Sequence, residues 1–472
     1  MSEGKRTDLR EKTIFTIDGA DAKDLDDAVS IEKTETGNYL LGVHIADVSH
    51  YVAEGSETDI EALFRGTSIY PPGQVIHMLP EELANGVCSL NKGEDRLTLS
   101  VFMEITPGGE VAEHRINESV ICSRERMVYS DVSDIIENKN LNLIKKYDNI
   151  YREILLMDEL ASVLRKRRLE RGSLDFDVAE ACISFGEDGK VLSVEVAERR
   201  AAEKMIEEFM IAANETVAKR VFHSKSPFVY RVHEKPEQEK MEDFKVFIKT
   251  FGLNLKGSMR DISPQALAGI LKKTEGKEYE NIVNKVMLRS MNKAFYSPDC
   301  KGHFGLGSRY YCHFTAPIRR YPDLIAHRIL KELLAGQVTG KRKRALTKKA
   351  AKAAELSSIA ERKALEIERE AEKRIKAEFM SYHIGEVFSG VISGVTYFGI
   401  FVELPNTIEG MVRTDLIDWD YYEYEPERYR LVGEISKRTF TIGDRLNVKV
   451  EAVDVLKGYI DFTLYEHKIE EK

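Results

Sequence analysis

The chain contains the stretch Thr13-Ile-Phe-Thr-Ile-Asp-Gly-Ala-Asp-Ala-Lys-Asp-Leu-Asp-Asp-Ala-Val-Ser-Ile31, in which aspartates crowd residues 18–27. Strand-like apolar runs at 13–17 and 28–31 flank these aspartates and would hold them at the ends of two strands. Carboxylates this close repel one another, and burying an unpaired one is costly. Hard divalent cations such as Mg²⁺ or Mn²⁺ remove that cost. The stretch therefore predicts a metal site at a strand end.

A solvated acidic turn is the alternative interpretation of the same residues. Asp18-Gly19 is a common turn signal, and most aspartate-rich loops bind nothing. A calcium-binding EF-hand is excluded, because its loop needs a glutamate at the twelfth position. Spacing alone leaves the metal site and the acidic turn open.

Composition indicates an ordinary globular protein of two or three domains. The chain has 472 residues, of which 43% are hydrophobic and 32% charged. No apolar run approaches the ~20 residues of a membrane helix, and the N-terminus lacks a signal-peptide core. Five scattered cysteines form no C-x-x-C pair, which favours the reducing cytoplasm. The net charge of -9 argues weakly against nucleic acid, but residues 341–352 hold seven Lys/Arg and no acid.

Hydrophobic patterns divide the chain into a mixed region and a later, strand-rich region. Strand-like runs dominate residues 13–110. Residues 342–380 lack Gly and Pro and predict one long helix, with an apolar stripe that includes Leu346, Ile359 and Leu365. Between these regions we expect helices at 143–170 and 203–223, a strand pair at 181–197 and a helix-rich stretch at 236–335.

Short alternating strands follow Gly385 and predict a small antiparallel barrel. The five runs are 386–392, 399–403, 411–413, 446–450 and 459–463. Phe398 lies near a turn and Phe401 on one face of the second run, beside basic residues such as Arg413. Phe401 could be core, or the aromatic residues could form a platform for single-stranded nucleic acid.

Four motifs, together with this barrel, resemble the ribonuclease R and ribonuclease II (RNB) family over residues 10–467, with ribonuclease R the more similar. The motifs are Thr16-Ile-Asp-Gly-Ala-Asp-Ala-Lys-Asp-Leu-Asp-Asp27, His44-Ile-Ala-Asp-Val-Ser-His-Tyr51, Arg65-Gly-Thr-Ser-Ile-Tyr70 and His313-Phe-Thr-Ala-Pro-Ile-Arg-Arg-Tyr-Pro-Asp323.

The resemblance implies an α+β fold. An RNB catalytic domain, a mixed sheet surrounded by helices, precedes a five-stranded OB-type (S1) barrel. The expected boundaries are 1–12 for a linker or truncated edge, 13–380 for the RNB domain with its final long helix, 384–467 for the barrel and 468–472 for a tail. Family members normally carry cold-shock-type domains before the RNB domain, whereas this chain begins almost at the catalytic strand.

The resemblance also implies the active-site residues. Asp18, Asp24, Asp26 and Asp27 would hold Mg²⁺ (or Mn²⁺), and Asp21 falls outside that set. Asp26 and Asp27 point to opposite sides of an extended backbone and could serve different ions. Two ions can flank a phosphodiester.

Further residues follow from the same motifs. Arg319 would meet the scissile phosphate, and Arg320 would pair with Asp323. The residues expected to contact RNA are Tyr70, Tyr129, Phe176, Glu207, Glu372, Phe398, Phe401 and Arg413. His44, Asp47 and His50 could suggest a transition-metal site, but a hydrogen-bonded strand end is the preferred interpretation.

The function implied is a processive 3′→5′ exoribonuclease that releases nucleoside 5′-monophosphates from single-stranded RNA, or from structured RNA with a 3′ overhang. Such an enzyme is expected to be a cytoplasmic monomer. The alternatives are a catalytically inactive RNA-binding regulator, against which the complete set of aspartates and Arg319 argues, and a metal-dependent phosphatase, which the barrel disfavours.

Overall fold

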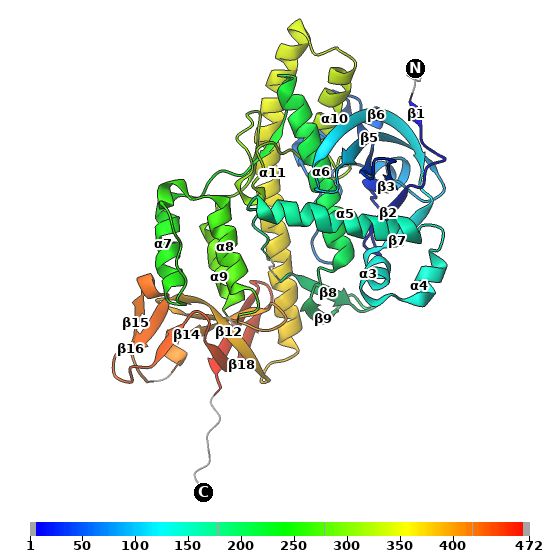
Figure 1. Ribbon diagram of the computed structural model, residues 1–472. Coiled ribbons are helices and arrows are strands. Elements are labelled where there is room, and N and C mark those ends of the chain that lie inside the picture. The colour runs from blue at the N-terminus through cyan, green and yellow to red at the C-terminus, as the bar shows by residue number, and fades with distance from the viewer. Residues whose placement is uncertain (1–5, 177–178, 278, 418, 466–472) are drawn as a thin grey trace.

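The protein was analysed as a computed structural model that describes residues 6–176, 179–277, 279–417 and 419–465 (Figure 1). A mixed sheet with helices around it is followed by a closed five-stranded barrel. This architecture confirms the predicted α+β fold. Among the described residues, no helix is long and apolar enough to cross a membrane.

The main domain is built on a seven-stranded sheet with the order β1-β6-β5-β4-β3-β2-β7. Its strands β1 and β7 pair in parallel with β6 and β2, and the other neighbours are antiparallel. The strands are β1 (Thr7–Asp8), β2 (Phe15–Asp18), β3 (Asp27–Lys33), β4 (Tyr39–Ala46), β5 (Asp95–Ile105), β6 (Val111–Cys122) and β7 (Glu125–Val128).

The N-terminal segment differs from the linker expected over residues 1–12. Residues 7 and 8 form β1 at the sheet edge, and Arg6 forms an ion pair with the buried Asp47 at 2.7 Å. Asp47 also pairs with Lys331, which ties this edge to helix α10 (Tyr321–Leu334). A two-residue strand has too little pattern to be predicted. Residues 1–5 and the expected tail at 468–472 lie outside the described residues.

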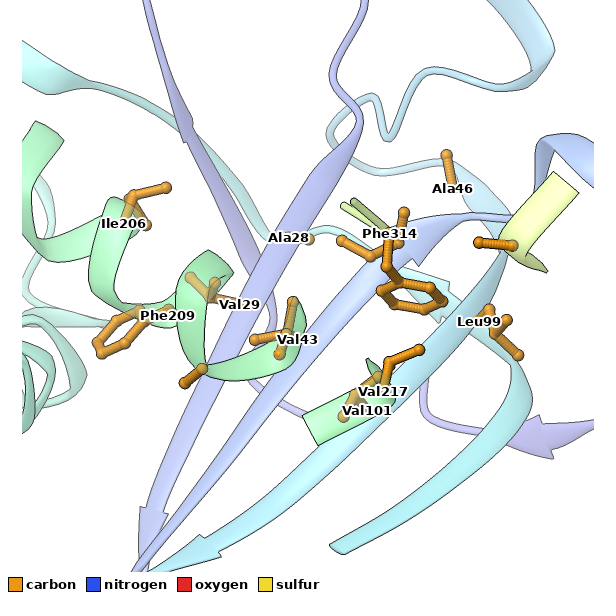
Figure 2. Close-up of a cluster of buried hydrophobic side chains, with 14 of the residues drawn as sticks. Ala28, Val29, Val43, Ala46, Leu99, Val101, Ile206, Phe209, Val217 and Phe314 are labelled. Carbon is orange, nitrogen blue, oxygen red and sulfur yellow. The ribbon is translucent and has the colours of Figure 1, made fainter. Parts of the chain in front are cut away.

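Helix α6 (Ala201–His223) packs against one face of the sheet. Figure 2 shows Phe209 and Val217 of this helix beside Val29, Val43 and Val101 of the three central strands. All five side chains are buried. Burial of each such side chain contributes about 1.5–3 kcal/mol, so this contact fixes α6 relative to the ends of β2 and β3.

The other helices of the main domain surround this core. The predicted helix at 143–170 is two helices, because the chain turns at residues 147–150. The remaining helices are α1 (Val48–Tyr51), α2 (Glu57–Arg65), α3 (Tyr129–Asn138), α4 (Leu141–Lys146), α5 (Tyr151–Glu170), α7 (Gln238–Lys249), α8 (Pro264–Thr274) and α9 (Glu280–Ser290). Two strand pairs accompany them, β8 (Ala181–Phe185) with β9 (Val191–Val196) and β10 (Tyr230–Val232) with β11 (Phe295–Ser297).

The long helix α11 (Gly340–Ser381) runs through the middle of the molecule (Figure 1). Its predicted apolar stripe is wrong in part, since Ile359 and Leu365 are exposed. Small residues such as Ala353 and Ser357 form the buried side instead. They allow a close approach of neighbouring segments, and a Cβ at Gly66 after α2 would lie 2.5 Å from Ala360.

The barrel closes in the order β12-β13-β14-β19-β18. Its strands are β12 (Val387–Thr396), β13 (Gly399–Glu403), β14 (Glu409–Arg413), β18 (Arg445–Asp454) and β19 (Tyr459–Leu464). All five predicted strands are present. A three-stranded sheet of β15 (Tyr422–Glu425), β16 (Arg430–Gly433) and β17 (Thr439–Thr441) lies between β14 and β18 in the sequence and was not predicted.

His44 of β4 is hydrogen-bonded to both neighbouring strands, in agreement with the hydrogen-bonded environment of the preferred interpretation. Its ring nitrogens lie 2.9 Å from the Ser30 hydroxyl and 2.8 Å from the Ser100 hydroxyl, and the side chain is fully buried. Burial lowers the pKa of His44 from 6.5 to about 3, and the charge of Lys12 acts in the same direction. The ring is therefore neutral in the folded protein at neutral pH.

We expect the contribution of His44 to the stability to be lost as the pH falls from 6.5 toward 3. In that window the unfolded chain binds a proton that folded His44 excludes, so this residue's contribution to the free energy of unfolding falls by about 1.4 kcal/mol per pH unit. Denaturant titrations at several pH values measure this slope. In His44→Gln the slope should be about one proton shallower. An unchanged slope would contradict this origin of acid sensitivity.

Candidate active site

The acidic stretch lies where β2 ends and β3 begins. Asp18 is the last residue of β2 and Asp27 is the first of β3, and the loop between them carries Asp24 and Asp26. All four carboxylates line one cavity of about 320 Å³. Asp21 is exposed and does not line it. The alternative of a fully solvated acidic turn is wrong for Asp26, which is only 5% exposed.

The carboxylates oppose one another electrostatically. Burial and the charges of Asp27, Asp26 and Asp24 raise the pKa of Asp18 to about 9. Burial raises the pKa of Asp27 to about 6 despite the nearby Arg319, and burial raises that of Asp26 well above its ordinary value. One oxygen each of Asp18 and Asp26 (Oδ2) is buried without a hydrogen bond. Unpartnered hard oxygens in a repelling cluster fit a divalent cation.

The residues around Arg319 close the cavity from a distant part of the chain. The Ile318 backbone N–H donates to Asp26 Oδ1 at 2.8 Å, and Arg319 Nε lies 3.8 Å from Asp26 Oδ2. The Arg319 carbonyl accepts from the Ser68 N–H at 2.9 Å and from the Thr67 hydroxyl at 3.0 Å. Three segments far apart in the sequence therefore meet at one point.

The two neighbouring arginines differ in their partners. Arg320 donates to Asp323 Oδ1 at 2.7 Å, and the same oxygen accepts from the Ala316 N–H at 2.8 Å. This pair stabilises the turn, as predicted for Arg320. The Arg319 side chain is 44% exposed and lines the cavity. Its guanidinium is therefore available to an anionic ligand.

Tyr70 and Tyr129 both lie beside the aspartates. The Tyr70 hydroxyl donates to Asp24 Oδ2 at 3.0 Å, and the Tyr70 N–H donates to Glu368 of α11 at 2.8 Å. Tyr129 begins α3 directly after β7, the parallel neighbour of β2, and lines the cavity. Burial and the nearby carboxylates raise the pKa of both phenols, so both keep their proton.

Glu207 extends from α6 into the same cavity. It forms an ion pair with Arg199, and its Oε1 lies 3.8 Å from Arg168 Nη2. The next residue, Glu208, points to a different side, where it is buried and accepts from Arg168 at 2.7 Å. Adjacent glutamates of one helix thus have separate environments.

Comparison with known families identifies this combination of site and barrel. Residues 6–336 match the family described as the RNB domain, and residues 381–464 match the S1 RNA binding domain. The chain belongs to the RNB family. The resemblance drawn from the four motifs is thereby confirmed.

Individual RNB relatives match nearly the whole chain. Ribonuclease R 1 of Lactococcus lactis is 46% identical over 457 residues, which cover 97% of this chain and 56% of that protein. Ribonuclease R of Thermotoga maritima is 46% identical over 465 residues, which cover 98% of this chain and 65% of that protein. The chain therefore spans roughly half to two thirds of the length of these relatives.

A solved RNB structure shows the same fold. The structure of Mycoplasma genitalium RNase R in complex with ribose methylated single-stranded RNA aligns with a TM-score of 0.92 at 32% identity. The alignment covers 98% of this chain and 72% of that chain. This likeness extends over both the RNB domain and the barrel.

Three predicted contacts of the main domain, Tyr70, Phe176 and Glu372, do not line the aspartate cavity. Glu372 is partly exposed on α11 and pairs with Lys376 at 2.6 Å. Glu368, one helical turn earlier, is the residue that contacts Tyr70, and the sequence analysis missed it. Phe176 lines another cavity, of about 930 Å³, which shares only Glu203 with the aspartate cavity. Phe176 is partly buried, next to residues 177–178 outside the described chain.

Other lining residues were also missed. Asn214 of α6 and Thr315, within the His313 motif, line the aspartate cavity. Asn214 further accepts from the Phe314 N–H at 2.9 Å and so joins α6 to the arginine turn. An asparagine inside an apolar helix pattern was the available signal for this role.

The predicted barrel residues form a separate group. Ile400 and Val402 point into the barrel, whereas Phe401 faces outward, with its ring 6.2 Å from that of the exposed Phe398. Arg413 pairs across the strands with Gly399 and forms an ion pair with Asp415 at 2.8 Å. Phe401 is therefore not plain core, and these residues do not line the aspartate cavity.

No complete ligand set is prearranged for a metal. Within the described ranges, no three His, Cys, Asp or Glu side chains already converge as metal ligands. The case for a cation rests on the unpartnered oxygens of Asp18 and Asp26 and on the raised pKa values.

Proposed function

We propose that the protein is a metal-dependent 3′→5′ exoribonuclease that hydrolyses single-stranded RNA to nucleoside 5′-monophosphates. The observation that carries the proposal is the meeting of four aspartates and Arg319 in one cavity of about 320 Å³. A cavity of this size suits one terminal nucleotide rather than a continuous strand. The relatives named ribonuclease R and the RNA-bound RNase R structure support the same substrate.

Asp18, Asp24, Asp26 and Asp27 would hold one or two divalent ions, with Mg²⁺ or Mn²⁺ suited to their hard oxygens. When bound, such ions supply an activated water and charge stabilisation of the leaving 3′-oxygen. Arg319 contributes a fixed positive charge whose planar fork matches two phosphate oxygens. Ile318 holds Asp26 in place through its backbone N–H.

Other residues in the cavity and beside it would position the last nucleotide. Tyr70, fixed between Asp24 and Glu368, offers a ring edge or face to the terminal base. Tyr129 and Glu207 can hydrogen-bond a 2′-hydroxyl, the group that separates RNA from DNA. Phe176 and Glu372 would act only on nucleotides farther from the bond that is broken.

The domain division follows the same logic. Residues 13–380 would carry the chemistry and residues 384–467 would hold RNA upstream of the site, through Phe398, Phe401 and Arg413. The competing interpretation is an inactive RNA-binding regulator. It is disfavoured because the described site retains every charged group that hydrolysis requires.

Product analysis tests the proposal directly. Single-stranded RNA, labelled at its 5′ end in one reaction and uniformly in another, is incubated with the protein and Mg²⁺, and the products are resolved by length and by end group. We expect progressive shortening from the 3′ end and release of 5′-mononucleotides, both abolished by EDTA. Intact RNA that remains bound would support the inactive regulator, and free phosphate would indicate a phosphatase.

RNA affinity should fall steeply with salt despite the acidic net charge. Each phosphate contact with a single strand contributes a slope of about -0.7 in log K against log salt. Filter binding with the Asp26→Asn protein, which should not consume the RNA, measures this slope. Arg413→Ala should reduce the magnitude of the salt slope by about 0.7. Phe401→Ala should weaken binding without changing the salt slope. Equal slopes in all three proteins would remove Arg413 from the RNA-binding surface.

A further inference from the structure

A second and larger cavity lies on another face of helix α6. It measures about 830 Å³ and lies between α5, α6, the turn at 109–114 and the segment 307–310. The aspartate cavity uses Glu207, Met210 and Asn214 of α6, whereas this second cavity uses Ala212, Glu215 and Lys219. We refer to this second cavity as the cationic cavity.

Positive charge exceeds negative charge in the cationic cavity. Three of its arginines pair with its three glutamates, in the pairs Arg167–Glu110, Arg168–Glu208 and Arg171–Glu215. Lys219, Arg220 and Arg309 also line it, and none of them forms an ion pair with a described residue. Burial lowers the pKa of the neighbouring His114, and the charges of Arg220 and Lys219 act in the same direction. Nothing in the described lining neutralises these three cations.

The cationic cavity and the aspartate cavity share a wall. Ile211 of α6 lines both of them. Arg168, which is 3% exposed, lies 2.7 Å from Glu208 on the cationic side and 3.8 Å from Glu207 on the catalytic side. Ile211 and the buried Arg168 guanidinium therefore lie where the two cavities adjoin.

We propose that the cationic cavity binds the nucleoside 5′-monophosphate that each cleavage releases. This inference rests on the proposed exoribonuclease function. A phosphate monoester carries about -1.5 to -2 charges near neutral pH, more than one internal phosphodiester of RNA, and three unpaired cations favour the higher charge. Tyr310 lines the same cavity, and its ring lies 4.8 Å from that of Phe222 and 5.3 Å from the Arg309 guanidinium, which places an aromatic side chain beside one of the cations.

The first test measures binding of adenosine 5′-monophosphate by calorimetry in EDTA, which keeps divalent ions out of the aspartate cavity. Lys219→Gln/Arg220→Gln should bind it about tenfold more weakly or worse. Arg309→Gln, on a different segment, should also bind adenosine 5′-monophosphate more weakly than wild type. Lys166→Gln/Lys249→Gln removes the same charge from exposed positions outside the cavity and should bind like wild type. Adenosine and inorganic phosphate should both bind more weakly than the nucleotide.

Several outcomes would overturn the assignment. Wild-type affinity in both cavity variants would place the nucleotide elsewhere, and equal affinity for inorganic phosphate would exclude a nucleotide site. An equal loss of single-stranded RNA affinity would make the cavity part of the RNA path. RNA cleavage by wild type is measured in parallel. If wild type does not cleave RNA, the proposed function is wrong. If wild type cleaves RNA but the variants bind the nucleotide like wild type, only the role of the cationic cavity is wrong.

Discussion

Asp26→Asn should lower the rate of RNA hydrolysis by about a thousandfold or more, while RNA affinity changes little. The amide keeps the shape of the side chain, and its Oδ1 can still accept from the Ile318 N–H. What disappears is one negative charge from the group that would hold the ions. Because that charge matters most when the transition state forms, turnover should fall far more than binding.

Asp21→Asn is the matched control, since Asp21 belongs to the same loop but is exposed and outside the cavity. Single-turnover hydrolysis and filter binding are measured for both variants. Asp21→Asn should behave like wild type in both measurements. Equal losses of binding and turnover in Asp26→Asn would instead indicate a structural or purely electrostatic role.

Replacing either of the two neighbouring glutamates of α6 should have a different effect, on stability for Glu208 and on substrate preference for Glu207. Glu208→Ala should lower the free energy of unfolding by about 3–5 kcal/mol, because it leaves the Arg168 guanidinium buried without its partner. Glu207→Ala should leave stability nearly unchanged, since the partly exposed pair with Arg199 contributes about 0–1 kcal/mol. It should instead narrow the ratio of RNA to DNA cleavage rates.

In Glu207→Ala the ratio of RNA to DNA cleavage rates should fall by about tenfold to a hundredfold, because an unpaired polar group at the sugar costs about 1–3 kcal/mol. Matched RNA and DNA oligonucleotides give the ratio, and denaturant unfolding gives the stability of both variants. A wild type that cleaves DNA as fast as RNA would refute sugar reading. So would a Glu207→Ala ratio equal to that of wild type.

The sequence predicted best those features that local pattern determines. The ends of β2 and β3, the helix α11 and the five barrel strands follow directly from periodicity. Side-chain contacts between distant segments could not be predicted in this way. Glu368 and Glu372 are four residues apart on one helix and therefore share a face, so no pattern could tell which of them reaches Tyr70.

The same limit explains the other differences. A helix usually buries its large apolar residues, but α11 buries small residues and exposes some of its large ones. The reason is that neighbouring backbone, such as that of Gly66, approaches the helix closely. The cationic cavity is assembled from four segments, of which only α5 carries a basic run, Arg165-Lys-Arg-Arg168. The surplus of positive charge in this cavity depends on which arginines pair with glutamates. These pairs form between segments that only the fold brings together.

The hydrogen bond between Asp26 and the Ile318 N–H joins positions 292 residues apart. During synthesis from the N-terminus, the acidic loop emerges first and carries its repelling carboxylates without Ile318 or the charge of Arg319. A nascent chain that ends before these residues carries the four aspartates but lacks the arginine side of the cavity. The proposed site is therefore completed late in translation, and premature termination yields fragments that lack it.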